Sequence, residues 1–188
     1  MRLSHLLGAA AVLAGGGAVV VATAPKVVKL LGPASRWFSW EELQHTSKPL
    51  PNIAGPLERL RLQALAAEGL DRFRDFLGRP LSISSAFRSK LVNMAVGGAK
   101  ASQHMTGEAA DLTVPGSGWT SEQLAAAWLA SGIPFDKLVW YTDKPHLHVS
   151  YRRGNNRGLV MKSVGGSYPQ VRPAASSPVP PNFAGAWL

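Results

Sequence analysis

The chain has 188 residues, 46% of them hydrophobic, which predicts one globular domain of ordinary size and excludes a wholly disordered protein. It has no cysteine, so disulfides and thiolate metal ligands are excluded, and any metal must be held by His, Asp, Glu or water. The formal net charge of +9 is spread along the chain and serves either solubility or attraction to an anionic membrane or cell-wall polymer. Because there is no recognition helix, zinc finger or basic region with interleaved aromatics, we expect no nucleic-acid partner.

An uncharged, apolar segment from Leu6 to Ala24 opens the chain and is flanked by basic residues. Its length is about that needed to span a bilayer as a helix. Three alternatives stay open: a cleaved export signal ending near Ala24, an uncleaved anchor, or a segment that enters a membrane and later leaves it. We therefore expect residues 1–36 to be a membrane-targeting segment and spacer, with the membrane as a partner and the protein in the periplasm or cell envelope.

Two helices are predicted after a brief helical turn within residues 36–56. Pro56 suits the first position of a long helix that ends at Gly78. Thr120 and Gln123 form a capping box for a helix that ends at Gly132. Apolar residues at helical spacing predict the core face of the long helix: Leu57, Leu60, Ala64, Leu65, Leu70, Phe73 and Leu77.

Four short apolar stretches read as strands, and they predict the fold class. They span residues 80–87, 107–114, 135–143 and 146–151. Helices combined with several short strands favour an α+β fold, here a single domain over residues 37–164 with a small, mainly antiparallel sheet flanked by helices. From Gly165 the chain is rich in Pro, Ser and Ala without a period, so we expect residues 165–188 to be a flexible tail.

The stretch "SQHMTGEAADL" brings His104 and Asp111 close together in a chain with only five histidines. It is either a polar loop that leads into a buried strand or the source of two ligands of a metal site. Gly107 permits a turn between the two residues, and a strand then determines the direction of the Asp111 side chain. A catalytic zinc site needs three protein ligands and an open position for water, so a third ligand must come from elsewhere.

The stretch "DKPHLHVSY" supplies the candidates for this third ligand. On a strand, His146 and His148 point to one face, while Leu147 and Val149 point into the core. Two histidines on one strand face are unlike the isolated His5 and His45, to which we assign no role. The residues thus predict a zinc site at the sheet.

These motifs resemble a known family. "SQHMTGEAAD" matches the S-x-H-x-x-G-x-A-x-D signature of zinc D-alanyl-D-alanine carboxypeptidases, murein endopeptidases and phage endolysins, the LAS-type metallopeptidases. "HLHVSY" resembles their closing H-x-H segment, "SSAFRS" their "SGYRS" stretch, and "VNMAVGGAKASQH" the joining segment of the phage-type branch. "FSWEEL" and "PNIAGPLERL" resemble the start of such domains, so the resemblance runs from about Phe38 to about Val160.

The resemblance implies roles for individual residues. His104, Asp111 and His148 would bind Zn²⁺. Arg88 would hold the carboxylate or carbonyl oxygen of the substrate, a role that suits a planar guanidinium. Ser102 would give a supporting hydrogen bond and contact the substrate.

The general base is open. Some relatives place an acidic residue three positions before the last ligand, but Pro145 stands there. We expect His146 as the base and Asp143 as the second choice or as a partner that orients His146. A rival register makes His146 the ligand and Asp143 the base. Glu108 lies within the signature, but strand alternation places it off the face of Asp111.

Together, these expectations describe a zinc-dependent peptidase that cuts amide bonds in peptidoglycan stem peptides. It would be a carboxypeptidase or an endopeptidase, in a phage lysis system or in bacterial wall remodelling, with peptidoglycan as its partner. We expect a monomer. The alternative is a peptidase-like module of a virion or cell envelope that binds without turnover.

Overall fold

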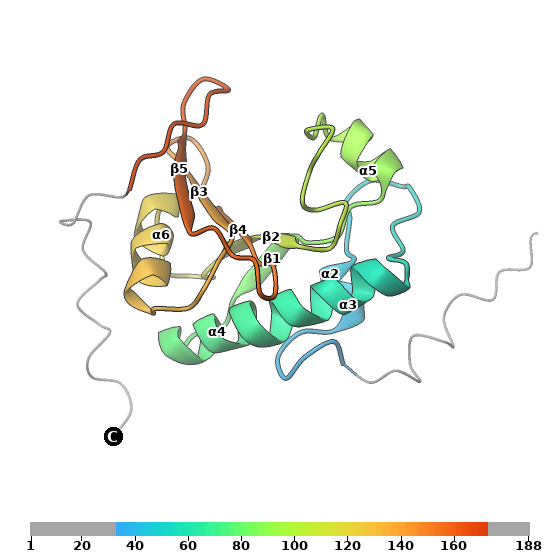
Figure 1. Cartoon of the computed structure of the whole chain (residues 1–188), viewed down its shortest axis with the longest axis horizontal. Coiled ribbons are helices and arrows are strands. Elements are labelled where there is room, and N and C mark those ends of the chain that lie inside the picture. The colour runs from blue at the N-terminus through green and yellow to red at the C-terminus, as the bar shows by residue number, and fades with distance from the viewer. Residues whose placement is uncertain (1–32, 173–188) are drawn as a thin grey trace, which may run out of the picture.

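A computed structural model describes residues 33–172 of the chain (Figure 1). The predicted membrane-targeting segment before Pro33 and the tail after Arg172 lie outside the described residues. Within residues 33–172, no helix is long and apolar enough to cross a membrane.

A five-stranded sheet forms the centre of the domain. Its strands are β1 (Ser82–Ser85), β2 (Ala109–Thr113), β3 (Lys137–Tyr141), β4 (Leu147–Ser150) and β5 (Leu159–Ser163), in the spatial order β1-β2-β4-β3-β5. The pairings β1–β2, β2–β4 and β3–β4 are antiparallel, and only β3–β5 is parallel. The α+β class and the mainly antiparallel sheet are therefore confirmed, although the sequence reading did not anticipate β5.

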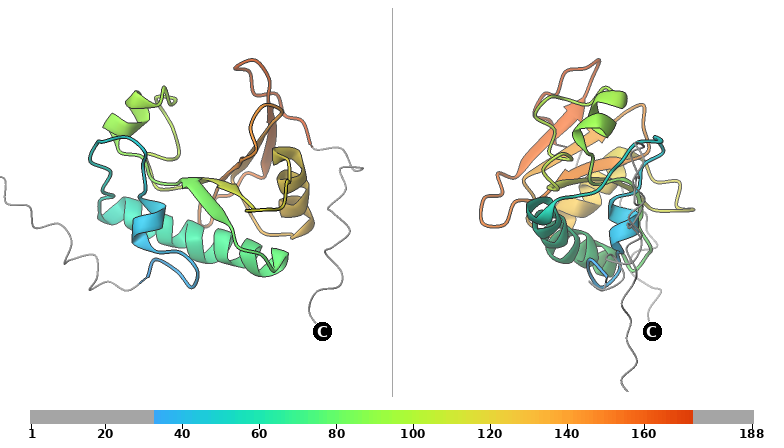
Figure 2. Two further views of the ribbon diagram at one scale, coloured as in Figure 1. Left: turned by 180° about the vertical axis from the view of Figure 1, so that it is seen from behind. Right: turned by 90° about the vertical axis from the view of Figure 1, so that its right-hand side faces the viewer.

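Helices flank this sheet (Figures 1 and 2). They are α2 (Trp40–Leu43), α3 (Pro56–Leu65), the π-helix η1 (Ala66–Leu70), α4 (Asp71–Leu77), α5 (Lys90–Ala95) and α6 (Ser121–Ala130). The predicted long helix is α3, η1 and α4 in direct succession, starting with Pro56 and ending at Gly78, which has φ +60°. The predicted capping box of α6 is formed by Thr120 and Gln123.

The hydrophobic core lies between the helices and one face of the sheet. Phe73 of α4 and Trp128 of α6 meet there with ring centroids 4.4 Å apart. Alternate strand residues face this core: Ala110 and Leu112 of β2, Leu138 and Trp140 of β3, Leu147 and Val149 of β4. The intervening residues of these strands face the other side, where the polar predicted site residues lie.

The core face predicted for α3 is partly wrong. Leu57 and Leu60 are 52% and 58% exposed, whereas Leu62 is fully buried. Leu60 and Leu62 point about 200° apart around a helix with 3.6 residues per turn, so only one of them can face the core. A helical period is compatible with either leucine facing the core, and packing of α3 against the sheet decides that it is Leu62.

Candidate metal centre

Three polar side chains meet on the face of the sheet opposite the core. Asp111 lies in β2 and His148 in β4, and the antiparallel register makes them direct cross-strand neighbours. His104 lies in the loop between α5 and β2. The nitrogen and oxygen atoms that these residues offer lie close enough together to hold one metal ion.

The spacing of these atoms fits a tetrahedral zinc ion. His104 Nε2 lies 3.2 Å from His148 Nδ1 and 3.3 Å from Asp111 Oδ1, and His148 Nδ1 lies 3.0 Å from Asp111 Oδ1. Ligands about 2.0–2.1 Å from a tetrahedral zinc ion lie about 3.3 Å from one another. Two imidazole nitrogens and one carboxylate oxygen are also donors that zinc accepts.

Second contacts orient two of these groups. His104 Nδ1 donates a hydrogen bond to the backbone oxygen of Ala86 at 2.7 Å, which turns the Nε2 edge of the ring toward Asp111 and His148. Arg88 Nη2 donates to Asp111 Oδ2 at 2.6 Å, and Arg88 Nε donates to Ser85 Oγ at 2.7 Å. Asp111 therefore presents only Oδ1 to the two histidines.

The electrostatics of Asp111 and His148 favour the charge states of metal ligands. Burial by itself would raise the pKa of Asp111, but His104 and His148 outweigh it and hold the pKa well below its usual value. Burial lowers the pKa of His148, which Asp111 offsets only in part. A carboxylate and neutral imidazoles are the forms that bind a metal.

Gly107 allows the loop from His104 to return into β2. Its φ is +73°, a conformation that favours glycine, and a Cβ there would collide with the backbone oxygen of Glu58 in α3. The residue thus meets two requirements at once: a left-handed turn and a close approach of two backbone segments.

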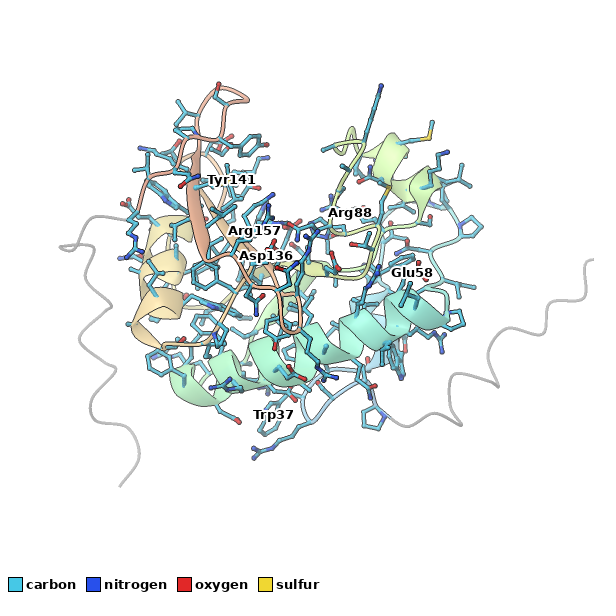
Figure 3. The ribbon with its side chains drawn as sticks, in the orientation of Figure 1. Trp37, Glu58, Arg88, Asp136, Tyr141 and Arg157 are labelled. Carbon is cyan, nitrogen blue, oxygen red and sulfur yellow. The ribbon has the colours of Figure 1, made fainter. Side chains whose placement is uncertain are left out.

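A cleft of about 500 Å³ opens over the three residues. One side is formed by Arg88 and the loop that includes Ser102, and the other by side chains of β3, β4 and β5 together with Tyr168. Arg88 and Tyr141 lie on opposite sides in Figure 3. The structure thus brings Arg88 and Ser102, the two residues expected to contact substrate, to the cleft, and it adds Tyr141 and Tyr168.

His146 borders the same cleft, and two contacts position it. Its ring lies 4.9 Å from the ring of Tyr141, and its backbone oxygen accepts a hydrogen bond from Ser121 Oγ at 2.6 Å. Ser121 Oγ in turn accepts a hydrogen bond from the backbone N–H of Tyr141 at 3.0 Å. Burial lowers the pKa of His146, and Lys144 and Arg88 act in the same direction against Asp111.

The other candidates lie elsewhere. Asp143 is exposed in the turn after β3 and is not among the residues that line the cleft. Glu108 points away from the metal centre, where its carboxylate accepts hydrogen bonds from Thr106 Oγ1 at 3.0 Å and Arg152 Nε at 3.1 Å. His148 rather than His146 joins the metal-binding group, which agrees with the preferred register and not with its rival.

Asp136 is a residue that the sequence reading missed. It is fully buried beside β3, where Arg157 donates two hydrogen bonds of 2.7 Å to its carboxylate, and Gln103 Nε2 donates a third at 2.8 Å (Figure 3). Because Gln103 directly precedes His104, this carboxylate anchors the loop that carries a candidate ligand. No local pattern reveals it, since the three residues are far apart in the chain.

Within residues 33–172, His104, Asp111 and His148 form one group of possible metal ligands that opens into a cleft, the arrangement of a mononuclear metal hydrolase. The family model described as peptidase M15 matches residues 38–150, and the chain belongs to this family. The resemblance seen in the motifs is thereby confirmed at the level of the family. No curated protein matches the chain. Membership supports a peptidase, and together with the metal-binding group it supports a zinc metallopeptidase.

Proposed function

We propose that the protein hydrolyses amide bonds in peptidoglycan stem peptides, as a D-alanyl-D-alanine carboxypeptidase or as a murein endopeptidase. The observation that carries the proposal is the triangle of His104, Asp111 and His148 at the base of a cleft, in a member of the peptidase M15 family. A zinc ion held by these residues would polarise the amide carbonyl and make water nucleophilic at neutral pH.

The remaining cleft residues supply binding and proton transfer. Arg88 presents a fixed positive charge that suits a carboxylate or a carbonyl oxygen of the substrate, and Ser102 borders the same space. His146 lies on the metal side of the cleft, two residues before His148, where it would accept a proton and pass it to the leaving amine. We prefer His146 to Asp143 as this base because Asp143 lies outside the cleft lining.

Digestion of purified peptidoglycan tests the proposal. Wild-type protein with zinc is expected to release fragments whose masses identify the bond that is cut. His146→Ala should act about 100-fold more slowly or worse, since general base catalysis contributes on that order, and Asp143→Ala should stay close to wild type.

The same assay separates the second class of function. A wild-type protein that binds zinc through His104 but leaves the wall peptides intact is a binding or structural module of a virion or envelope. Product release by wild type, lost in His146→Ala, excludes that alternative.

We also propose that the protein acts as a monomer in the periplasm or cell envelope, in phage lysis or wall remodelling. The apolar segment from Leu6 to Ala24 and the net charge of +9 support a location near an anionic wall and membrane. Cell fractionation of the full chain, with a variant that lacks residues 1–24 as the control, tests this location.

A further inference from the structure

Lys137 lies beside the metal centre with no role assigned so far. It is the first residue of β3, which pairs with β4 so that Val139 stands opposite His148 and Lys137 opposite Ser150. Alternate residues share a face, so Lys137 lies on the face of His148 as its diagonal neighbour. Such neighbours are about 7–8 Å apart, well within the reach of a lysine side chain. Its side chain lines the cleft.

The ammonium group of Lys137 has no ion pair or hydrogen bond among residues 33–172. The nearby carboxylate of Asp136 is already bound by Arg157 and Gln103. Asp111 is the sole acidic residue of the cleft lining, and Arg88 and the two histidines engage it. A half-buried cation is thus left facing the cleft.

Its surroundings make this cation costly to keep. Burial lowers the pKa of Lys137, and Arg157 adds to that effect, while Asp136 opposes it. Lys144, which lies over the ring of Tyr141 at 4.9 Å, adds another positive charge at the cleft. An anion that enters the cleft would relieve this excess of positive charge.

We propose that Lys137 is a subsite for a carboxylate of the substrate, separate from Arg88. Arg88 is held by Asp111 Oδ2 and Ser85, whereas Lys137 is free to form a charge-assisted hydrogen bond to an incoming anion. Lys137 thereby selects peptides that carry a carboxylate close to the cleaved bond. This inference rests on the proposed function for the choice of a peptide as the ligand.

The test compares synthetic stem pentapeptides, labelled with a dye at the amino end, whose free carboxylates are converted to carboxamides one at a time. Binding to the full chain with zinc is followed by fluorescence anisotropy after rapid mixing, before turnover. Lys137→Met removes the charge and keeps the length of the side chain. Lys137→Arg keeps the charge. Lys162→Met is the matched control, because Lys162 lies in the same sheet but over the ring of Trp140.

We expect one amidation to weaken binding to wild type by about tenfold or more, as for the loss of a hydrogen bond between charged groups. The same amidation should have no effect on Lys137→Met, which binds the unmodified peptide as weakly as wild type binds the amide. Lys137→Arg should retain the preference for the carboxylate, and Lys162→Met should behave as wild type. The subsite would be overturned if wild type did not bind the peptides, or if no amidation weakened its binding. It would also be overturned if Lys137→Met kept the wild-type preference for the carboxylate.

Hydrolysis of the same peptides is measured in parallel, so that the two proposals fail separately. A protein that selects the carboxylate through Lys137 but cleaves nothing keeps the subsite and loses the proposed activity. A protein that cleaves all peptides without any dependence on Lys137 keeps the activity and loses the subsite.

Discussion

Arg88 holds one oxygen of Asp111 while the other oxygen faces the two histidines. Arg88 Nη2 donates to Asp111 Oδ2 at 2.6 Å, and Asp111 Oδ1 lies 3.0 Å from His148 Nδ1 and 3.3 Å from His104 Nε2. The arginine therefore restricts Asp111 to one metal-facing oxygen. It acts on a candidate ligand in addition to bordering the cleft.

Replacing Arg88 by Met should weaken zinc binding. Loss of a group that orients a ligand typically lowers metal affinity about 10–100-fold. Competition with a chelating dye measures the affinity. Arg36→Met is the control, because Arg36 is exposed and pairs with Asp75 far from the cleft. An unchanged zinc affinity in Arg88→Met would show that the contact to Asp111 does not orient it.

Zinc should stabilise the folded protein through His104. A ligand present at 100 times its dissociation constant adds about 2.7 kcal/mol to the free energy of unfolding. Thermal unfolding with zinc or with a chelator measures this gain in wild type, and it should vanish in His104→Ala. His45→Ala replaces an exposed histidine and should keep the gain. A gain of equal size in His104→Ala would place the metal elsewhere.

Ser121→Ala should lower kcat with little change in KM. Ser121 is fully buried, and its hydroxyl joins the backbone of His146, the proposed base, to that of Tyr141. Its loss leaves two partly buried backbone groups without this partner and so loosens the position of His146. Unfolding should be easier by about 1–3 kcal/mol.

Ser131→Ala is the matched control for Ser121→Ala, because Ser131 Oγ bonds two backbone groups at the other end of α6. Chemical denaturation should show a loss of stability in both variants. Only Ser121→Ala should alter kcat. If both variants had the same kcat, the role of Ser121 would be purely structural.

Asp136 should make the free energy of unfolding depend on pH in the acidic range. Burial would raise its pKa, but Arg157 and Gln103 outweigh burial and lower the pKa from 3.8 to about 2. A carboxyl group with a depressed pKa stabilises the fold above its unfolded pKa, and this stabilisation is lost as the pH falls from about 4 to about 2.

The shift corresponds to about 2 kcal/mol of the free energy of unfolding at neutral pH. Asp136→Asn should lose this contribution at pH 7 and show a flatter profile in acid, measured by denaturant unfolding across that range. Asp75→Asn is the control, since Asp75 forms an exposed pair with Arg36. If the stability of Asp136→Asn fell with pH as steeply as that of wild type, Asp136 would not be the source of this pH dependence.

Gly107→Ala should destabilise the protein more than Gly116→Ala. Both glycines have a positive φ, +73° and +67°, and a side chain there strains the backbone by about 1 kcal/mol or more. Only at Gly107 would the new Cβ also meet the backbone of Glu58, whereas Gly116 faces open space. Thermal unfolding of the two variants compares these effects. Equal losses of stability would mean that the backbone of Glu58 moves away from the new Cβ without a measurable loss of stability.

Local patterns in the sequence predicted the features that depend on neighbouring residues. The capping box at Thr120 and Gln123 and the helix end at Gly78 follow from backbone geometry over a few residues. The strand predicted to begin at His146 is shorter in the structure: β4 starts at Leu147, so His146 precedes the strand, although it borders the same cleft as His148. The motif around His104 and Asp111, with the H-x-H stretch, was sufficient to predict the family and a metal-binding group, and both agree with the comparison and the structure.

The tertiary structure decided what depends on pairing between distant segments. The choice of Leu62 over Leu60 for the core required the sheet against which α3 packs, because a helical period allows either. Strand β5, its parallel pairing with β3, and the burial of Asp136 under Arg157 are contacts between residues far apart in the chain. Lys137 becomes a neighbour of His148 only through the register of β3 on β4, a register that the sequence of neither strand contains by itself.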